Sequence, residues 1–126
     1  MTTTTAPLLI LVAGPYRSGT NDDPARIAAN RRAMDEAALQ LFRLGHVPVT
    51  GEALALPLIE LAGSRAIGDA VFNEIFHPIA ERLVAKCDAC LRIGGASQGA
   101  DHMVSLALAN GRAVFRSIAD IPQVAR

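Results

Sequence analysis

The sequence predicts an α/β protein, a three-layer sandwich in which a small parallel sheet of four to five strands is flanked by helices. Two observations predict this fold: short apolar runs alternate with helical patterns along the chain, and short connections join them. The chain has 126 residues, and 51% of them are hydrophobic, enough for one domain with a real core. We expect residues 1–7 to be disordered or extended and residues 8–126 to form this single domain.

The first predicted strand is the apolar run 8–13, which ends at Gly14-Pro15. A continuous apolar run of this length is typical of a strand that is buried on both faces, as in a parallel sheet. A helix should follow between Asp23-Pro24, which resembles an N-cap with proline in the first turn, and Gly45, which resembles a helix stop. The apolar side chains of this helix recur at helical spacing: Ile27, Met34, Ala38 and Leu41.

The middle of the chain has weaker punctuation. Residues 46–50 predict a second strand, and Pro48 indicates an edge or a strand end because it removes one backbone donor. Residues 51–76 are apolar and interrupted by glycine and proline, so we expect short helices and an irregular loop. A further helix should begin at His77-Pro78 and run through Lys86.

The last third of the chain continues the alternation. Residues 88–93 predict a third strand, and the glycine-rich loop 94–101 leads into a helix that runs to about Asn110. Gly111 stops this helix before a last strand at residues 113–115. The order strand, helix, strand therefore repeats to the end of the chain, as expected for parallel strands joined by helices.

Charge and composition exclude several classes of protein. Twelve basic and twelve acidic side chains cancel, so the chain has no strong field for a nucleic-acid polymer or an anionic membrane surface. No apolar run approaches the roughly 18–20 residues of a membrane span. The N-terminus lacks the pattern of a signal peptide, and Cys87 and Cys90 are too close for a disulfide scaffold, so we expect a cytoplasmic protein.

The loop after the first strand is the first candidate binding site, because ligands of open parallel sheets bind beyond the carboxyl ends of the strands. Gly14 and Pro15 shape a turn that lets the backbone approach a ligand. Tyr16 can stack or donate, and Arg17 can hold a phosphate or carboxylate in a bidentate fork. The alternative is a surface turn with an exposed arginine.

The loop 94–99 is the second candidate, because it leads into a helix whose free amide groups favour an anion or a hydroxylated ligand. We expect Gly95, Ser97 and Gly99 to contact such a ligand. The loop lacks the glycine spacing of a dinucleotide fingerprint and the lysine of a phosphate loop. The alternative is a helix start capped by Ser97 or Asp101.

Few other residues suggest chemistry. Asp101 suits a cap, an acceptor for a ligand hydroxyl or a nucleophile. Three scattered histidines predict no metal site, and the two cysteines are best interpreted as small buried hydrophobes, so we expect neither metal nor cofactor. One glutamate beside the apolar segment is a candidate to point into the cleft, while most are solvated: Glu52, Glu60, Glu74 and Glu81.

Three stretches resemble the nucleoside 2-deoxyribosyltransferase-like superfamily: 11–17 (LVAGPYR), 44–49 (LGHVPV) and 87–114, from CDA to GRAV. The resemblance covers residues 8–116. It implies a flavodoxin-like or Rossmann-like fold and a small-molecule ligand, a nucleoside or nucleotide. It also implies hydrolysis or exchange of the N-glycosidic bond, with a carboxylate against the anomeric carbon to stabilise the oxocarbenium character that develops there.

The resemblance also implies residue roles. Tyr16 and Arg17 would position the base or phosphate, and Ser97 and Gly99 would bind the sugar or phosphate. Aligning the chain on Ser97 and Gly99 places Met103 where the family has its catalytic glutamate. Asp101 lies two residues earlier, turned by roughly 200° on a helix.

The resemblance leaves several functions open. One expectation is an enzyme whose catalytic residues are Asp101 and Tyr16, and another is a non-catalytic nucleotide or sugar-phosphate sensor that keeps the cleft. A third is hydrolysis of another ribosyl compound by a different carboxylate, such as Glu74. The family's assemblies often complete each site with a neighbouring subunit, and the apolar segment 53–76 offers a surface for one, so we expect a homo-oligomer.

Overall fold

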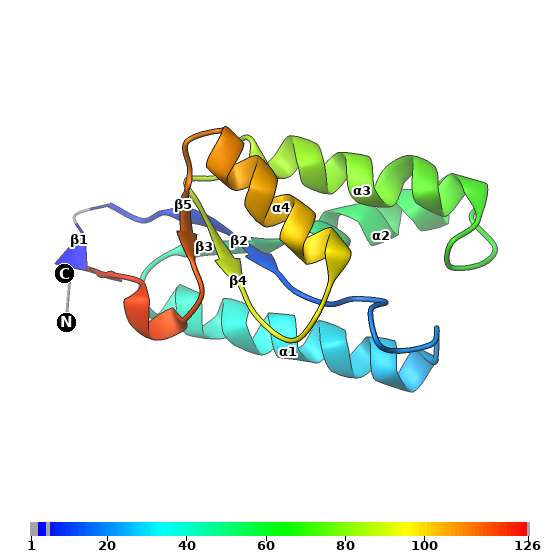
Figure 1. Cartoon of the computed structure of the whole chain (residues 1–126), viewed down its shortest axis with the longest axis horizontal. Coiled ribbons are helices and arrows are strands. Elements are labelled where there is room, and N and C mark those ends of the chain that lie inside the picture. Colours follow the sequence, from blue (N-terminus) through cyan, green and yellow to red (C-terminus); the bar gives the residue numbers. More distant parts are fainter. Residues whose placement is uncertain (1–2, 5, 126) are drawn as a thin grey trace.

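A four-stranded parallel sheet forms the centre of the computed structural model, which describes residues 3–4 and 6–125. The strand order is β3-β2-β4-β5, formed by Val47–Thr50, Leu9–Ala13, Ala89–Arg92 and Ala113–Phe115. Helix α1 (Pro24–Arg43) lies on one face of the sheet, and α3 (Ala70–Val84) and α4 (Gln98–Ala109) lie on the other, with α2 (Gly51–Leu61) packed against α3 (Figure 1). The predicted α/β sandwich is confirmed.

Strand β2 is buried on both faces, as its continuous apolar run predicts. Ile10 and Val12 pack with Met34 of α1, whereas Leu11 and Ala13 pack against α3 and α4. The four strand residues are between 0% and 5% exposed. Burying an aliphatic side chain of the size of leucine or valine contributes roughly 1.5–3 kcal/mol, so this strand is a major source of stability.

Helix α1 has the predicted signals at both ends. The Asp23 carboxylate accepts a hydrogen bond from the backbone N–H of Ala25, 3.3 Å away, and Pro24 is the first helical residue. After the helix, Gly45 has a φ of +98°, which a residue with a Cβ atom rarely adopts. A Cβ atom at Gly45 would also lie 2.6 Å from the Cβ atom of Val124, so the C-terminal segment packs directly on this turn.

The predicted helix start at His77-Pro78 is wrong, because α3 already begins at Ala70. The Asp69 carboxylate caps it, accepting hydrogen bonds from the N–H groups of Phe72, at 2.8 Å, and Arg65, at 2.9 Å. These backbone hydrogen bonds lower the pKa of Asp69 to about 2. Pro78 therefore lies inside the helix, where it removes one backbone donor without ending it.

The segment 51–76 is also more regular than predicted. Helix α2 continues through Pro57 to Leu61, so only residues 62–69 form a connection between two helices. None of the helices in the described part of the chain is both long enough and apolar enough to cross a membrane.

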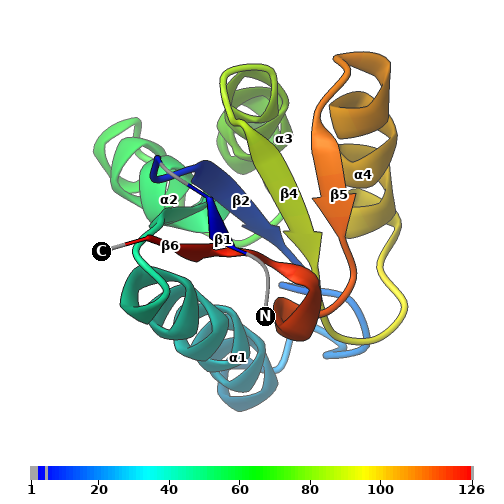
Figure 2. The same ribbon diagram turned by 90° about the vertical axis from the view of Figure 1, so that its left-hand side faces the viewer.

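A second, two-stranded sheet was not predicted. Strand β1 (Thr3–Thr4) pairs in parallel with β6 (Gln123–Val124), which follows a 3₁₀ helix, η1 (Ile118–Asp120). Figure 2 looks onto the end of the molecule where these strands lie. Thr3 and Thr4 are thus extended, while Met1, Thr2 and Thr5 lie outside the described residues, so the expectation for residues 1–7 stays partly a prediction.

His46 connects this C-terminal segment to the main sheet. Its side chain is 2% exposed, and Nδ1 accepts a hydrogen bond from the backbone N–H of Leu8, 3.0 Å away. Nε2 lies 2.6 Å from the carbonyl oxygen of Pro122 and donates to it, which assigns the neutral tautomer with the proton on Nε2. One buried imidazole therefore joins the start of β2 to the segment that precedes β6.

We expect His46→Ala to lower the free energy of unfolding by about 2–3 kcal/mol, because it removes two hydrogen bonds and leaves the part-buried N–H group of Leu8 unpaired. Amide exchange should also speed up at Val124 and Ala125, whose N–H groups bond to Leu44 and Thr4. Chemical denaturation and hydrogen exchange measure both effects. His102→Ala, at an exposed histidine, should cost less than about 0.5 kcal/mol; equal losses in the two variants would contradict this role.

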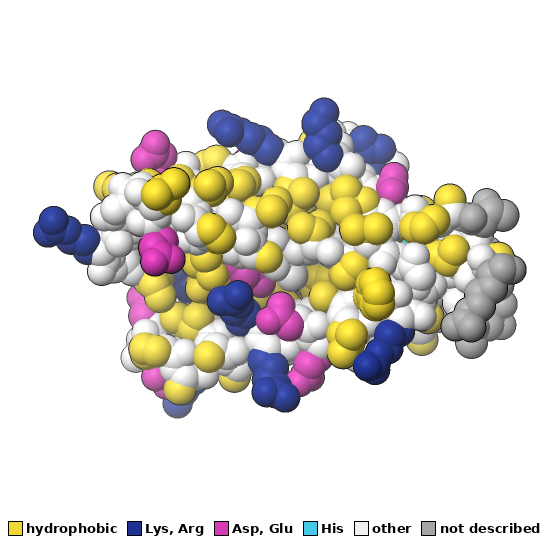
Figure 3. Space-filling view, turned by 180° about the vertical axis from the view of Figure 1, so that it is seen from behind, with side chains coloured by type: hydrophobic (Ala, Val, Ile, Leu, Met, Phe, Trp, Pro, Cys, Tyr) yellow, Lys and Arg dark blue, Asp and Glu magenta, His cyan; other side chains and the backbone are white. Residues whose placement is uncertain are grey.

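Apolar side chains are exposed on the side of the molecule formed by α2. Leu54, Leu58 and Leu61 are 42%, 46% and 86% exposed, and they recur at intervals of four and three residues. Figure 3, which views the molecule from behind, shows hydrophobic side chains across the middle of that face.

We expect a homo-oligomer, so light scattering after size-exclusion chromatography should give a multiple of the monomer mass at micromolar concentration. A stable monomer would contradict it.

Candidate functional site

A cavity of about 480 Å³ opens at the carboxyl end of β2, between the loop that follows this strand and the start of α4. The chain leaves β2 toward β3 on one side and later returns to β4 on the other, so this is the point where the strand order reverses. Its walls come from the loop after β2, the first turn of α2, the middle of α3 and the first turn of α4. The volume lies within the usual range of small-molecule sites, about 300–1,000 Å³.

The two loops that the sequence singles out meet at this cavity. Gly14, Tyr16 and Arg17 line it from the loop after β2, and Ser97 and Gly99 line it from the start of α4. A Cβ atom at Gly14 would lie 3.0 Å from Cγ1 of Ile93, so glycine allows the two loops to approach closely. Five of the predicted site residues are therefore brought together.

Pro15 and Gly95 are not among the described residues that line the cavity. Gly94 has a φ of +77°, and a Cβ atom there would lie 2.7 Å from Cδ of Pro15. The carbonyl oxygen of Gly95 accepts a hydrogen bond from Nη2 of Arg92, 2.8 Å away. Pro15 and Gly95 thus shape the contact between the two loops and are not part of the described lining of the cavity.

Asp101 also lies outside the described lining of the cavity. Its Oδ1 accepts a hydrogen bond of 3.0 Å from Nε of Arg92, whose side chain is only 8% exposed, while the Asp101 side chain is 66% exposed. Ser97, rather than Asp101, caps α4, with its Oγ accepting from the N–H of Ala100. Asp101 therefore holds the start of α4 against the end of β4, and its expected role as a catalytic carboxylate stays a prediction.

Met103 lines the cavity at the position where the resemblance implies a glutamate, and it is 6% exposed. A buried thioether cannot act as a nucleophile toward a sugar in the way a carboxylate does. Any carboxyl chemistry in this cavity must therefore come from another element.

Glu52 supplies a carboxyl group to the cavity. Thr50 caps α2 by accepting a hydrogen bond from the N–H of Ala53, which places Glu52 in the first turn. The Glu52 side chain lines the cavity and is 6% exposed. Among the residues that the structure describes, none gives its Oε1 a hydrogen bond, although that atom is buried. A buried acceptor without a partner costs free energy, so a donor group from a ligand or a water molecule in the cavity would stabilise it.

Burial raises the pKa of Glu52, since it disfavours the charged carboxylate. The residue's own backbone N–H acts in the opposite direction, and the nearby Asp35 and Arg31 respectively raise and lower the pKa. The net result is a carboxyl group that keeps its proton to higher pH than an exposed glutamate. Such a group is suited to donate a proton to a bound ligand.

Sequence reasoning named Glu52 only as one of four glutamates. Glu60, Glu74 and Glu81 are exposed, and none of the three is among the described residues that line the cavity. The signal that separates Glu52 from them is its place directly after the strand 47–50, in the first turn of a helix whose next residues are apolar.

Aromatic rings form the wall beside Glu52. The ring centroids of Tyr16 and Phe76 lie 5.2 Å apart, and those of Phe76 and Phe72 lie 4.8 Å apart in a stacked pair. His77 meets Phe76 edge-on at 5.2 Å and also lines the cavity. Burial, followed by the charge of Glu52, raises the pKa of Tyr16, so the tyrosine hydroxyl stays a hydrogen-bond donor.

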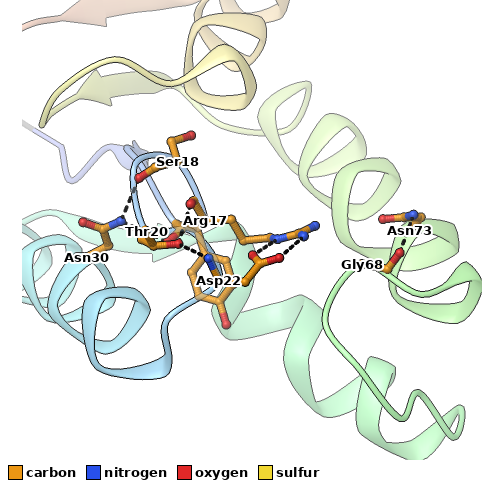
Figure 4. A network of polar contacts seen from close by, with 8 residues as sticks. Arg17, Ser18, Thr20, Asp22, Asn30, Gly68 and Asn73 are labelled. Carbon is orange, nitrogen blue, oxygen red and sulfur yellow. Dashed lines mark hydrogen bonds and ion pairs between the residues drawn. The ribbon is translucent and has the colours of Figure 1, made fainter.

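Arg17 lines the cavity but is already paired. Its Nε and Nη2 donate to Oδ1 and Oδ2 of Asp22, both at 2.9 Å (Figure 4). This hydrogen bonding raises the pKa of Arg17 and lowers the pKa of Asp22. The bidentate hydrogen bonds that Arg17 was expected to donate to a ligand phosphate are thus donated to Asp22 of the same loop. The sequence did not predict this pairing.

The other candidate groups do not form a site. Cys87 and Cys90 are free and buried in the apolar core with Leu11, and burial raises the pKa of both thiols to about 11. Within the described ranges 3–4 and 6–125, no group of three His, Cys, Asp or Glu side chains is placed to hold a metal ion.

Comparison of the sequence with protein-family models and with curated proteins finds no match. The assignment of the site therefore depends on the geometry of the chain itself.

We expect the stability of the Glu52→Gln variant, relative to the wild type, to depend on pH. Burial raises the pKa of Glu52 in the folded state, so ionising the carboxyl group costs more free energy in the folded state than in the unfolded state. The wild type therefore loses stability as pH rises. The variant should be more stable than the wild type at pH 7–8, and the difference should shrink as pH falls toward the ordinary glutamate value of 4.5. Urea unfolding between pH 4 and pH 8 measures it.

Glu60→Gln, at an exposed glutamate of the same helix, is the matched control for the change in net charge. If the difference between Glu52→Gln and the wild type did not change between pH 4 and pH 8, the Glu52 carboxyl would not be desolvated in solution.

Proposed function

We propose that the cavity binds a nucleoside-like ligand, a flat base joined to a sugar, and that Glu52 acts on its N-glycosidic bond. The observation that carries this proposal is the buried Glu52 carboxyl group, whose Oε1 receives no hydrogen bond from the described residues and which lines the cavity. A ligand nitrogen or hydroxyl beside Oε1 would offset the cost of burying it.

The two sides of the cavity suit the two halves of such a ligand. Tyr16 and Phe76 offer an apolar aromatic wall, against which a planar base can stack. On the side of α4, the Ser97 hydroxyl and the first N–H groups of the helix, at Gln98 and Gly99, can bond to sugar oxygens. This division supports a nucleoside over a simple sugar or a simple aromatic compound.

The proposed reaction is hydrolysis with Glu52 as general acid. Glu52 transfers its proton to a nitrogen of the base as the bond between that base and the anomeric carbon breaks, with the bonding electrons leaving on the base. The oxygen of a water molecule forms the new bond to the anomeric carbon, and the water proton returns to the Glu52 carboxylate. The products are the free base and the sugar, and the raised pKa of Glu52 favours the acid form that starts the reaction.

A second function is favoured by Met103. This buried residue lines the cavity where the resemblance implies the glutamate that attacks the sugar. A chain that lost that carboxylate and gained no other catalyst would bind a nucleoside or nucleotide without cleaving it. The protein would then act as a sensor or binding module.

Chromatographic detection of free base separates the two functions. Purified protein is incubated with ribonucleosides, deoxyribonucleosides and their 5′-monophosphates. We expect release of base by the wild type, and a loss of about 10²–10⁴-fold in kcat for Glu52→Gln, the typical contribution of a general acid. The rate should fall as pH rises through the raised pKa of Glu52, since the acid form is then lost.

Glu60→Gln should keep the wild-type rate, because Glu60 is exposed and is not among the described residues that line the cavity. Binding without release of base would support the sensor and reject catalysis. If the protein neither binds a compound of the panel nor releases base from one, both functions are rejected.

A further inference from the structure

We propose that the cavity selects uncharged nucleosides over nucleoside phosphates, and that Asp22 determines this specificity by occupying Arg17. The inference rests on the proposed function and names the substrate class of the same site. Its basis is the arrangement of charge at the mouth of the cavity, where both residues are part of the lining.

One bidentate edge of the Arg17 guanidinium group is already occupied by a carboxylate. The Asp22 carboxylate accepts hydrogen bonds of 2.9 Å from Nε and Nη2. On the other side, Cζ of Arg17 lies 5.7 Å from the ring centroid of Phe72. A Cβ atom at Gly68 would lie 2.9 Å from Nη2 and 3.0 Å from Nη1, so the backbone of the connection between α2 and α3 also packs against the guanidinium group. A phosphate could bind the edge of Arg17 formed by Nε and Nη2 in a fork only by displacing the Asp22 carboxylate.

The loop is built to hold Asp22 in this place. Asn21 and Asp22 have φ values of +54° and +56°, a backbone conformation that non-glycine residues seldom adopt. The N–H of Asp22 donates to Oγ1 of Thr20, at 3.1 Å, and Thr20, which is 2% exposed, donates in turn to the carbonyl oxygen of Arg17 at 2.6 Å. Figure 4 shows these bonds converging within the loop.

Helix α1 holds the base of the same loop. The Nδ2 atom of Asn30 donates to the carbonyl oxygens of Tyr16, at 3.0 Å, and Ser18, at 3.4 Å. The loop is thus bonded both within itself and to a long helix, so the Arg17–Asp22 pair is held in place before any ligand arrives.

The remaining charges of the cavity do not favour an anion. Apart from Arg17, the described lining residues include no lysine or arginine, and His77 is the other basic side chain there. The acidic side chains that line it are Asp22 and Glu52. In the first turn of α4, where a helix dipole would attract a phosphate, the Asp101 carboxylate already interacts with that dipole and with Arg92, although it lies outside the described lining. A phosphate dianion entering this cavity would meet the Asp22 carboxylate, already paired with the one arginine of the described lining, Arg17.

The proposal is tested by comparing the dissociation constant of each nucleoside with that of its 5′-monophosphate, measured by isothermal titration calorimetry. Where base is released, the two values of kcat/KM are compared instead. The buffer is held at pH 8, where imidazole groups are mostly uncharged. We expect the wild type to prefer the nucleoside by about tenfold or more. Asp22→Asn should shift the ratio toward the monophosphate by about tenfold or more, because it frees the Arg17 fork.

Asp23→Asn is the matched control. It removes the same charge from the neighbouring residue, and asparagine caps a helix as well as aspartate does. The control should keep the wild-type ratio. Asparagine also tolerates the left-handed backbone at position 22, so Asp22→Asn is expected to keep the loop, which circular dichroism and thermal unfolding check.

A wild type that binds the monophosphate as tightly as the nucleoside would overturn the proposal, and so would an Asp22→Asn variant whose ratio is unchanged. In both results a nucleoside still binds, so the proposed function stands while this specificity fails. If neither ligand binds to the wild type or to the variant, the proposed function fails first, and this inference fails with it.

Discussion

The central position of β2 is the constraint on which the rest of the structure depends. This strand pairs in parallel with β3 on one side and β4 on the other, with Leu11 opposite both Val49 and Cys90. Because α1 and α4 must each cover one face of it, the loops that leave β2 and β4 diverge at the same edge of the sheet. The cavity lies between those loops, so its position follows from the pairing of one buried strand.

Within that frame, the chemistry of the cavity depends on how each charge is solvated or paired. Arg17 and Arg92 are both bonded to carboxylates, and these pairs give the two loops their shape. Glu52 is the exception, since it is buried beside aromatic rings and Oε1 receives no hydrogen bond from the described residues. The same isolation that makes its ionised form costly makes its acid form available to a ligand. This arrangement of residues therefore provides a cavity with one buried carboxyl group beside an arginine that is already paired.

The fold and part of the site could be predicted from local patterns. The apolar run before Gly14 predicted a strand buried on both faces, the Asp23-Pro24 pair predicted the start of α1, and the rule for parallel sheets singled out the loops containing Arg17 and Ser97 as candidate sites. These features depend on residues that are close in the sequence, where helical and strand periodicity is informative. The rule for parallel sheets supplied the one long-range step.

The remaining features depend on contacts that no local pattern contains. His46 and Pro122 are 76 residues apart, so the small second sheet could not be expected from two-residue strands. The pairing of Asp101 with Arg92 joins a helix to the preceding strand, and the burial of Glu52 requires α3 and the loop after β2 to pack over it. The start of α3 was wrongly predicted at His77-Pro78, because proline is common in the first turn of a helix. The helix in fact begins after Asp69, whose carboxylate accepts a hydrogen bond from the N–H of Phe72.

A crystal structure with a bound C-nucleoside tests the central claim most directly, since the carbon–carbon bond between its base and sugar resists hydrolysis. The account predicts a base stacked on Tyr16 and Phe76, with a ring nitrogen or hydroxyl within about 3.2 Å of the Glu52 carboxyl oxygens. A ligand bound elsewhere on the chain, or one in the cavity whose polar atoms all lie beyond hydrogen-bond distance of Glu52, would contradict it.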